Sequence, residues 1–259
     1  MADNPGTPAL EVLYRDDSLI AINKPAGLLV HPSLVDRHET RSAMILLRDQ
    51  IGQFVYPVHR LDKPTSGVLL FALSPEIARI LSASFTEKRI DKRYLAVVRG
   101  YTEDSGRVDY PLKERHDKMT DRRARKDKPP QPAVTEYRRL ATLELPVCVD
   151  RYPTSRYSLV EVTPLSGRKH QIRRHFKHLS HPIIGDTSYG KSNHNRLFMQ
   201  RYGCRRLLLA ATHLALAHPV SGKPLRLDAG LDTEFDRVIR LFQTLAKPDP
   251  GNRDKPQGY

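Results

Sequence analysis

The segment His59–Phe71 (HRLDKPTSGVLLF) places a carboxylate where it could do chemistry. A polar turn, Asp62–Gly67, leads directly into an apolar run, so Asp62 is expected at the mouth of a buried strand. Arg60 and Lys63 flank it, and positive neighbours favour the ionised form of a carboxylate. An ionised aspartate suits nucleophilic or general-base work, not acid work. Taken alone, an aspartate before Lys-Pro is more often an ordinary turn opener.

A second segment, Ser166–Asp186 (SGRKHQIRRHFKHLSHPIIGD), is rich in basic side chains. Ile172, Phe176 and Leu179 follow a helical spacing, which predicts a helix packed on the core. The pair Ser166-Gly167 is expected to expose backbone N–H groups at the start of that helix. A helix N-terminus beside arginines suits a phosphate or a carboxylate. A solvated basic face is the alternative interpretation.

A third and weaker candidate is the run Lys92-Arg93-Tyr94 at the start of a predicted strand. A tyrosine ring between basic residues can stack on a nucleotide base. A tyrosine at a strand start also commonly packs into the core. The sequence leaves both interpretations open.

Other familiar chemistries are missing from the sequence. It contains neither G-x-x-x-x-G-K-[ST] nor G-x-G-x-x-G, and Thr65-Ser66-Gly67 lacks the first glycine of a nucleophile elbow. The histidines of the second segment lie in a Lys/Arg run that holds no carboxylate before Asp186, which makes a poor zinc site. The two cysteines, Cys148 and Cys204, lie far apart, which excludes a disulfide scaffold and fits a reducing compartment. We therefore expect no metal and no cofactor.

The charge balance indicates a polyanionic partner. The 259 residues include 43 Lys and Arg against 29 Asp and Glu, a net charge of +14, which favours nucleic acid. The stretch Lys113–Pro132 holds eight basic and four acidic residues and almost nothing apolar. It is predicted to be a mobile loop, either a solvated linker or an RNA-contacting arm. Without a long apolar run or a signal segment, a cytoplasmic protein is expected.

Local patterns predict the elements that must position these residues. Strands are expected over Leu10–Tyr14, Ser18–Asn23, Val68–Leu73, Tyr94–Arg99, Ser158–Thr163 and Leu207–Ala217, the last of which could be a helix by length alone. Ser74 and Pro75 predict a helix start, and an apolar stripe from Phe235 predicts a closing helix. Strands and helices mix without a strand–helix–strand rhythm, which predicts an α+β fold. One domain is expected over residues 10–246, between tails at 1–9 and 247–259.

Taken together, these motifs resemble those of the RluA-type pseudouridine synthases. His59-Arg60-Leu61-Asp62 with Thr65-Ser66-Gly67 resembles the family's active-site motif, and Lys92-Arg93-Tyr94 resembles its tyrosine motif. Asn23-Lys24-Pro25 with Gly27 resembles the strand that precedes the active site, and the run Gly167–Asp186 resembles the third motif. The order and rough spacing agree from about Leu10 to Leu231.

The resemblance implies a mixed, largely antiparallel sheet with flanking helices, and the isomerisation of uridine to pseudouridine in RNA. It implies that Asp62 is the catalytic carboxylate and that Arg173 pairs with it. It also implies that Tyr94 stacks on the target uracil and serves proton transfer, while Arg60 helps to displace the base. Basic residues of the motifs and the loop are expected to contact RNA: Lys24, His59, Lys63, Arg168, Lys169, Arg174, Arg122, Arg123, Arg125 and Lys126.

Further stretches resemble the members that modify uridine 65 of tRNA: Ile51-Gly52-Gln53, Asp109–Leu112, Lys128–Thr135 and Arg151–Tyr157. We therefore expect tRNA as the substrate of a monomer with no obligate protein partner. A substrate in 23S ribosomal RNA is the alternative within the family. A non-catalytic RNA-binding or assembly factor, and an N-glycosidase that releases uracil, are the alternatives from other classes.

Two departures from the family pattern limit what the resemblance implies. Relatives often carry a histidine where this chain has Ala210, so any role of that histidine does not transfer. Many bacterial pseudouridine synthases carry an N-terminal S4 RNA-binding domain. With 13 residues ahead of Tyr14, none is expected here.

Overall fold

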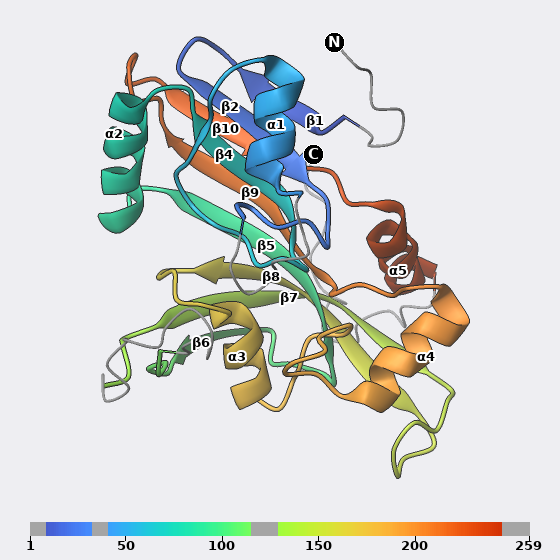
Figure 1. The fold of residues 1–259 in the computed structure, drawn as a ribbon. Coiled ribbons are helices and arrows are strands. Elements are labelled where there is room, and N and C mark those ends of the chain that lie inside the picture. Colours follow the sequence, from blue (N-terminus) through green and yellow to red (C-terminus); the bar gives the residue numbers. More distant parts are fainter. Residues whose placement is uncertain (1–8, 33–40, 115–128, 245–259) are drawn as a thin grey trace, which may run out of the picture.

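The computed structural model describes residues 9–32, 41–114 and 129–244. In that part of the chain one ten-stranded sheet runs through the molecule in the order β1-β2-β4-β9-β5-β8-β7-β6, with β10 beside β9 and β3 beside β4 (Figure 1). The strands are β1 (Glu11–Arg15), β2 (Leu19–Lys24), β3 (Tyr56–Pro57), β4 (Ser66–Ala72), β5 (Asp91–Arg99), β6 (Ser105–Asp109), β7 (Val134–Leu145), β8 (Ser155–Pro164), β9 (Leu209–Ala217) and β10 (Pro224–Asp228). All pairings are antiparallel except the parallel pair β4–β9. The expected α+β class and the mixed, largely antiparallel sheet are confirmed.

Helices cover both faces of the sheet. They are α1 (Ala43–Ile51), α2 (Pro75–Thr86), α3 (Gln171–His178), α4 (Ser192–Tyr202) and α5 (Thr233–Thr244). Alternate residues of β2 show how this works, because Ile20 packs in a cluster with Leu47 of α1, whereas Leu19 packs in a cluster with Leu81 of α2. A strand buried on both faces has no polar face, which explains the uninterrupted apolar run of β4.

The other half of the sheet is sandwiched in the same way. Phe176 of α3 packs on one face of β5 and β8, whereas Phe198 of α4 and Phe235 of α5 pack on the opposite face. The α1 cluster and the α3 cluster both contact Tyr94 of β5. Figure 1 shows α1 and α3 on the near side of the sheet, so Tyr94 lies between the two helices on that face.

Most elements predicted from local patterns are present within a few residues of the expected bounds. The helix start at Ser74 is confirmed, because its Oγ accepts a hydrogen bond from the backbone N–H of Ile77 at 3.2 Å. The apolar run Leu207–Ala217, which could have been a helix by length alone, forms the strand β9. The helices α1 and α4 and the long strand β7 were not predicted.

The predicted helix start at Ser166-Gly167 is wrong. The helix α3 begins at Gln171, after His170 in a left-handed conformation with φ 56°. The side chain of Gln171 folds back onto the preceding loop and accepts hydrogen bonds from the backbone N–H of Arg168 at 3.0 Å and from Ser166 Oγ at 2.7 Å. The expected anion site at a helix N-terminus therefore does not form at this pair.

The predicted basic loop leaves the sheet between β6 and β7. Its two ends are held together, because Leu112 and Gln131 exchange backbone hydrogen bonds of 2.9 and 3.0 Å. Residues 115–128 lie outside the described residues, as do 1–8 and 245–259, so the proposed tails and domain bounds stay predictions.

No helix in the described ranges is long and apolar enough to span a membrane.

The two halves of the sheet meet at the parallel pair β4–β9, where Gly67 lies opposite Ala211. Gly67 has a φ of +110°, a conformation that side chains disfavour. A Cβ atom added there would lie 2.0 Å from the carbonyl oxygen of Ala211. Only glycine lets the two strands approach this closely directly after the turn that holds Asp62.

We predict that Gly67→Ala lowers the free energy of unfolding by about 2–4 kcal/mol, because the new methyl group must push β4 from β9 in a strained backbone conformation. Urea unfolding followed by circular dichroism measures this change. Gly230→Ala is the control, because a Cβ atom there meets nothing within 4 Å. Equal stability of the two variants would contradict the prediction.

Candidate active site

Asp62 lies in the turn between β3 and β4. The backbone N–H of Thr65 donates to the carbonyl of Asp62 at 3.0 Å, which closes the turn. The N–H of Gly27 donates to the carbonyl of Lys63 at 2.8 Å, so the loop that follows β2 supports the turn from the side. The side chain of Asp62 is 23% exposed and can therefore be reached from solvent. The expected place at the mouth of a buried strand is confirmed.

The partner of Asp62 comes from α3 on the other half of the sheet. Nη1 of Arg173 donates a hydrogen bond to Oδ2 of Asp62 at 3.1 Å, and the Arg173 side chain is only 4% exposed. The other carboxylate oxygen, Oδ1, lies 3.9 Å from Nε2 of His170. No residue in the described ranges donates a hydrogen bond to that oxygen. The structure thus brings Asp62 and Arg173 together across 111 positions of sequence.

A second carboxylate holds the same guanidinium. Asp186 accepts from Nε of Arg173 at 2.8 Å and from Nη2 at 2.9 Å, and its side chain is fully buried. Burial alone would lower the pKa of Arg173, but hydrogen bonds and charge from Asp186, and then from Asp62, outweigh it and raise that pKa. Burial alone would raise the pKa of Asp186, but its hydrogen bonds with Arg173 lower it. Arg173 is therefore a permanent cation between two carboxylates.

Tyr94 faces the same space from β5. It lies opposite Ala211 of β9 and Val162 of β8, and its side chain is half-buried between α1 and α3. Burial, and then the charge of Asp62, raise the pKa of the Tyr94 phenol. The ring therefore stays neutral around pH 7 and keeps its proton. It packs against the core, as one interpretation expected, and it lies close enough to Asp62 to sense that charge. Stacking on a base stays a prediction.

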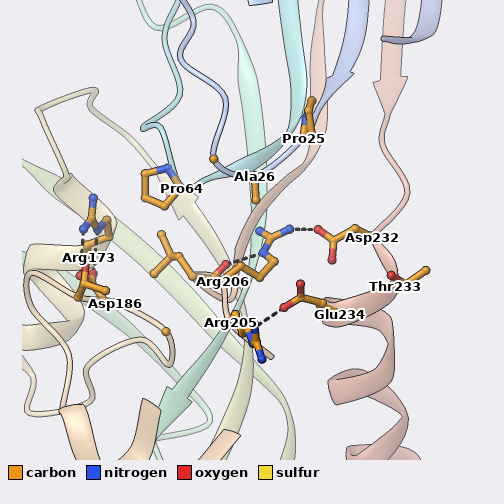
Figure 2. Close-up of a pocket in the computed structure, with 14 residues that line it drawn as sticks. Pro25, Ala26, Pro64, Arg173, Asp186, Arg205, Arg206, Asp232, Thr233 and Glu234 are labelled. Carbon is orange, nitrogen blue, oxygen red and sulfur yellow. Dashed lines mark hydrogen bonds and ion pairs between the residues drawn. The ribbon is translucent and has the colours of Figure 1, made fainter. Parts of the chain in front are cut away.

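A cavity of about 430 Å³ opens beside Arg173 (Figure 2). Arg173 and Asp186 lie on one side, and Figure 2 shows Arg206 with Asp232 and Arg205 with Glu234 on the other. Arg206 donates to Asp232, and the backbone N–H of Arg205 donates to Glu234 at 2.7 Å. The lining also includes Pro25, Ala26, Gly27, Pro64, Gly185, Thr187, Leu207 and Thr233. Its acidic and basic side chains are equal in number, so the cavity has no strong net charge.

The expected RNA contact by Lys24 is wrong. Its side chain is buried, and its ammonium donates to the carbonyls of Pro25, Leu28 and Lys63 at 2.9, 2.8 and 3.2 Å. Burial, and then the charge of Arg206, lower the pKa of Lys24 to about 7, whereas Asp62 acts in the opposite direction. Lys24 therefore ties the loop after β2 to the Asp62 turn and does not reach a phosphate.

His59 is half-buried, and its described contacts are with the protein interior. Its ring stacks on Phe85 of α2 with centroids 4.8 Å apart, and its Nε2 accepts from the backbone N–H of Leu70 at 3.0 Å. Burial, and then the charge of Lys92, lower the pKa of His59 to about 3. A neutral imidazole offers a phosphate no charge, and the expected RNA contact by His59 stays a prediction.

The remaining basic candidates lie around the site at different depths. Arg60, Arg168 and Lys169 are exposed, whereas Lys63 and Arg174 are half-buried. Arg168 donates to the carbonyl of Pro132 at 3.3 Å and Arg174 to that of Lys113 at 3.0 Å. The two ends of the basic loop thus rest on α3 and its preceding loop. The loop residues Arg122, Arg123, Arg125 and Lys126 lie outside the described residues.

Two residues beside Asp62 were not assigned a role from sequence. Asp186 was noted only as the first carboxylate after a basic run, although a lone acidic residue closing such a run is a reasonable signal for a buried partner. His170 was interpreted as part of a basic surface. Its Nδ1 lies 2.9 Å from the hydroxyl of Tyr189, and burial is the main cause that lowers its pKa, against the charge of Asp62.

Comparison with known proteins identifies the family to which this fold and site belong. Residues 18–178 match the family model described as RNA pseudouridylate synthase. This match covers more than half of the chain and includes Asp62, Tyr94 and Arg173. The chain belongs to the RNA pseudouridylate synthase family, and is thereby an isomerase that acts on uridine in RNA.

Individual relatives narrow the comparison. The chain is 55% identical over 233 residues to tRNA pseudouridine synthase C of Pasteurella multocida (strain Pm70), covering 90% of this chain and 96% of that protein. It is 51% identical to tRNA pseudouridine synthase C of Haemophilus influenzae (strain ATCC 51907 / DSM 11121 / KW20 / Rd), covering 90% and 98%. Among solved structures, Human RNA Pseudouridylate Synthase Domain Containing 4 aligns with a TM-score of 0.66 at 27% identity, covering 90% and 93% of the two chains.

We predict that Arg173→Ala lowers the free energy of unfolding by about 3–5 kcal/mol, because it leaves Asp186 charged, buried and without its cation. Arg138→Ala removes an arginine paired with Glu161 at 3.1 Å on the surface and is expected to cost about 1 kcal/mol or less. Chemical denaturation of both variants provides the measurement. A similar loss of unfolding free energy in both variants would show that Arg173 stabilises the fold no more than an exposed ion pair does.

Proposed function

We propose that this protein converts uridine to pseudouridine in transfer RNA, at position 65, with Asp62 as the catalytic carboxylate. Two observations support this. Relatives above 50% identity, aligned over nearly their whole length, carry the name tRNA pseudouridine synthase C. The observation that carries the chemistry is the half-exposed pair of Asp62 with the buried Arg173, next to a neutral tyrosine ring.

The reaction makes modest demands on a protein. The bond between N1 and C1′ breaks, the base turns, and a bond between C5 and C1′ forms while C5 loses a proton and N1 gains one. No electron is gained or lost, so the isomerisation balances without a redox partner. It needs a carboxylate in a water-poor pocket and a surface that retains the detached uracil.

Asp62 meets the first demand. Its Oδ2 is engaged by Arg173, whereas Oδ1 accepts no hydrogen bond within the described structure and is available to a substrate. Such a carboxylate can attack C1′ or C6, or take the proton from C2′. The guanidinium supplies a fixed positive charge that does not have to reorganise as the reaction proceeds.

Tyr94 meets the second demand. Its ring lies between α1 and α3 beside Asp62, where a uracil base can stack on its face. Because the phenol keeps its proton, it can donate to or accept from the detached base. Its packing against both helices holds the ring in place for a base that has lost its covalent tether.

The exposed basic residues supply RNA binding. A uracil inside a helix is unreachable, and flipping it out costs a few kcal/mol of unstacking. Arg60 lies next to the site, close enough to His31 that its charge, after burial, lowers the pKa of that histidine. Arg60 displaces the base, while Lys63, Arg168, Lys169, Arg174 and the loop at 113–132 contact phosphates. We place the enzyme in the cytoplasm as a monomer, where its substrate is made.

We predict that Asp62→Asn remains folded and binds RNA but loses turnover by at least about 10⁴-fold, because the amide cannot act as a nucleophile or base. Tritium release from C5-labelled uridine in tRNA measures turnover, and filter binding measures RNA affinity. Asp228→Asn makes the same change at an exposed carboxylate on β10 and should keep normal activity. Normal product formation by Asp62→Asn would exclude the proposed role.

The substrate itself is tested in cells and with purified protein. In a strain that lacks the gene, pseudouridine is expected to disappear from tRNA position 65 and to return when the intact gene is supplied. Mapping both tRNA and 23S ribosomal RNA decides between the two substrates, since a loss confined to ribosomal RNA would overturn the proposal. Release of free uracil by the purified protein would instead identify an N-glycosidase.

A further inference from the structure

We propose that Asp186 is a positioning residue that limits Arg173 to a single hydrogen bond with Asp62 and so leaves the second oxygen of Asp62 available to the substrate. This inference rests on the proposed roles of Asp62 and Arg173. Asp186 itself is fully buried and therefore acts only through the guanidinium.

The hydrogen-bonding geometry of arginine carries the argument. A guanidinium presents its N–H groups in a rigid fork, and the edge formed by Nε and one Nη matches both oxygens of a carboxylate. Asp186 occupies that edge with bonds of 2.8 and 2.9 Å. With the guanidinium held in this orientation, Nη1 is the nitrogen that donates to Asp62, at 3.1 Å. Without Asp186, the two-pronged edge is free to turn to Asp62 and to occupy both of its oxygens.

Asp186 is itself held rigidly, as a positioning role requires. Its Oδ1 accepts from the backbone N–H groups of Ser188 and Tyr189, both at 2.9 Å. The ring of Tyr189 lies under the Arg173 guanidinium, 5.1 Å from its central carbon. The guanidinium is therefore fixed both in its plane, by Asp186, and from below, by the tyrosine ring.

Asp186 also sets how much positive charge Asp62 experiences. The groups that face Asp62 are Arg173 and His170 from α3 and its preceding loop, Lys24 from β2 and Tyr94 from β5. The negative charge of Asp186 offsets part of the field of Arg173. Removing that charge favours the ionised form of Asp62 and at the same time lets the guanidinium bind it more closely, which makes the carboxylate less reactive.

The test is the pH profile of Asp186→Asn. Asparagine keeps an oxygen for Ser188 and Tyr189, but its NH₂ cannot accept from Arg173. We expect kcat to fall about 10²-fold, with KM and the RNA dissociation constant within about twofold of the native values. The acid limb of kcat/KM is expected to move to lower pH. Glu161→Gln, which removes a carboxylate paired with Arg138 on the surface, is the control with unchanged activity and profile.

A second variant separates geometry from charge. Asp186→Glu keeps the charge and displaces the guanidinium, so kcat should fall while the acid limb of kcat/KM stays in place. If Asp186→Asn does not fold, Asp186→Glu provides the test. Native kcat in Asp186→Asn, or a lower kcat with an unmoved acid limb in that variant, would overturn the inference. Full activity of Asp62→Asn would instead remove the proposed function, so the two failures are distinguishable.

Discussion

The site depends on one guanidinium shared by two carboxylates. Arg173 joins Asp62, in the turn ahead of β4, to Asp186, in the loop after α3, and it is almost completely buried. A buried charge is stable only when its partners are fixed, because each lost hydrogen bond leaves a desolvated ion. This requirement joins the two halves of the molecule at Asp62, the carboxylate proposed to be catalytic.

The sheet brings the parts of this site to one place. The two halves meet at the parallel contact of β4 with β9, which the backbone of Gly67 makes possible, and Asp62 lies directly before that contact. From the neighbouring strand β5, Tyr94 fills the space between α1 and α3. In the proposed reaction the detached base lies between a carboxylate in a hydrogen-bonded turn and a ring on a paired strand.

The net charge of +14 serves two purposes that sequence composition cannot separate. Lys24 uses its charge inside the protein, where three carbonyls orient it beneath the Asp62 turn. Arg168 and Arg174 brace the two ends of the basic loop against α3 and its preceding loop. RNA affinity therefore rests on fewer cations than the count implies, and part of the basic surface is coupled mechanically to the helix that presents Arg173.

The sequence by itself determined which residues could take part. A polar turn ahead of an uninterrupted apolar run identified Asp62 at the mouth of a strand, and the family resemblance implied its association with Arg173 and Tyr94. The tertiary structure alone decided that Lys24 is buried, that His59 contacts the protein interior, that α3 begins at Gln171, and that Asp186 holds the arginine. The reason is physical: periodicity and turn chemistry are local, whereas burial and ion pairing depend on contacts between residues far apart in the chain.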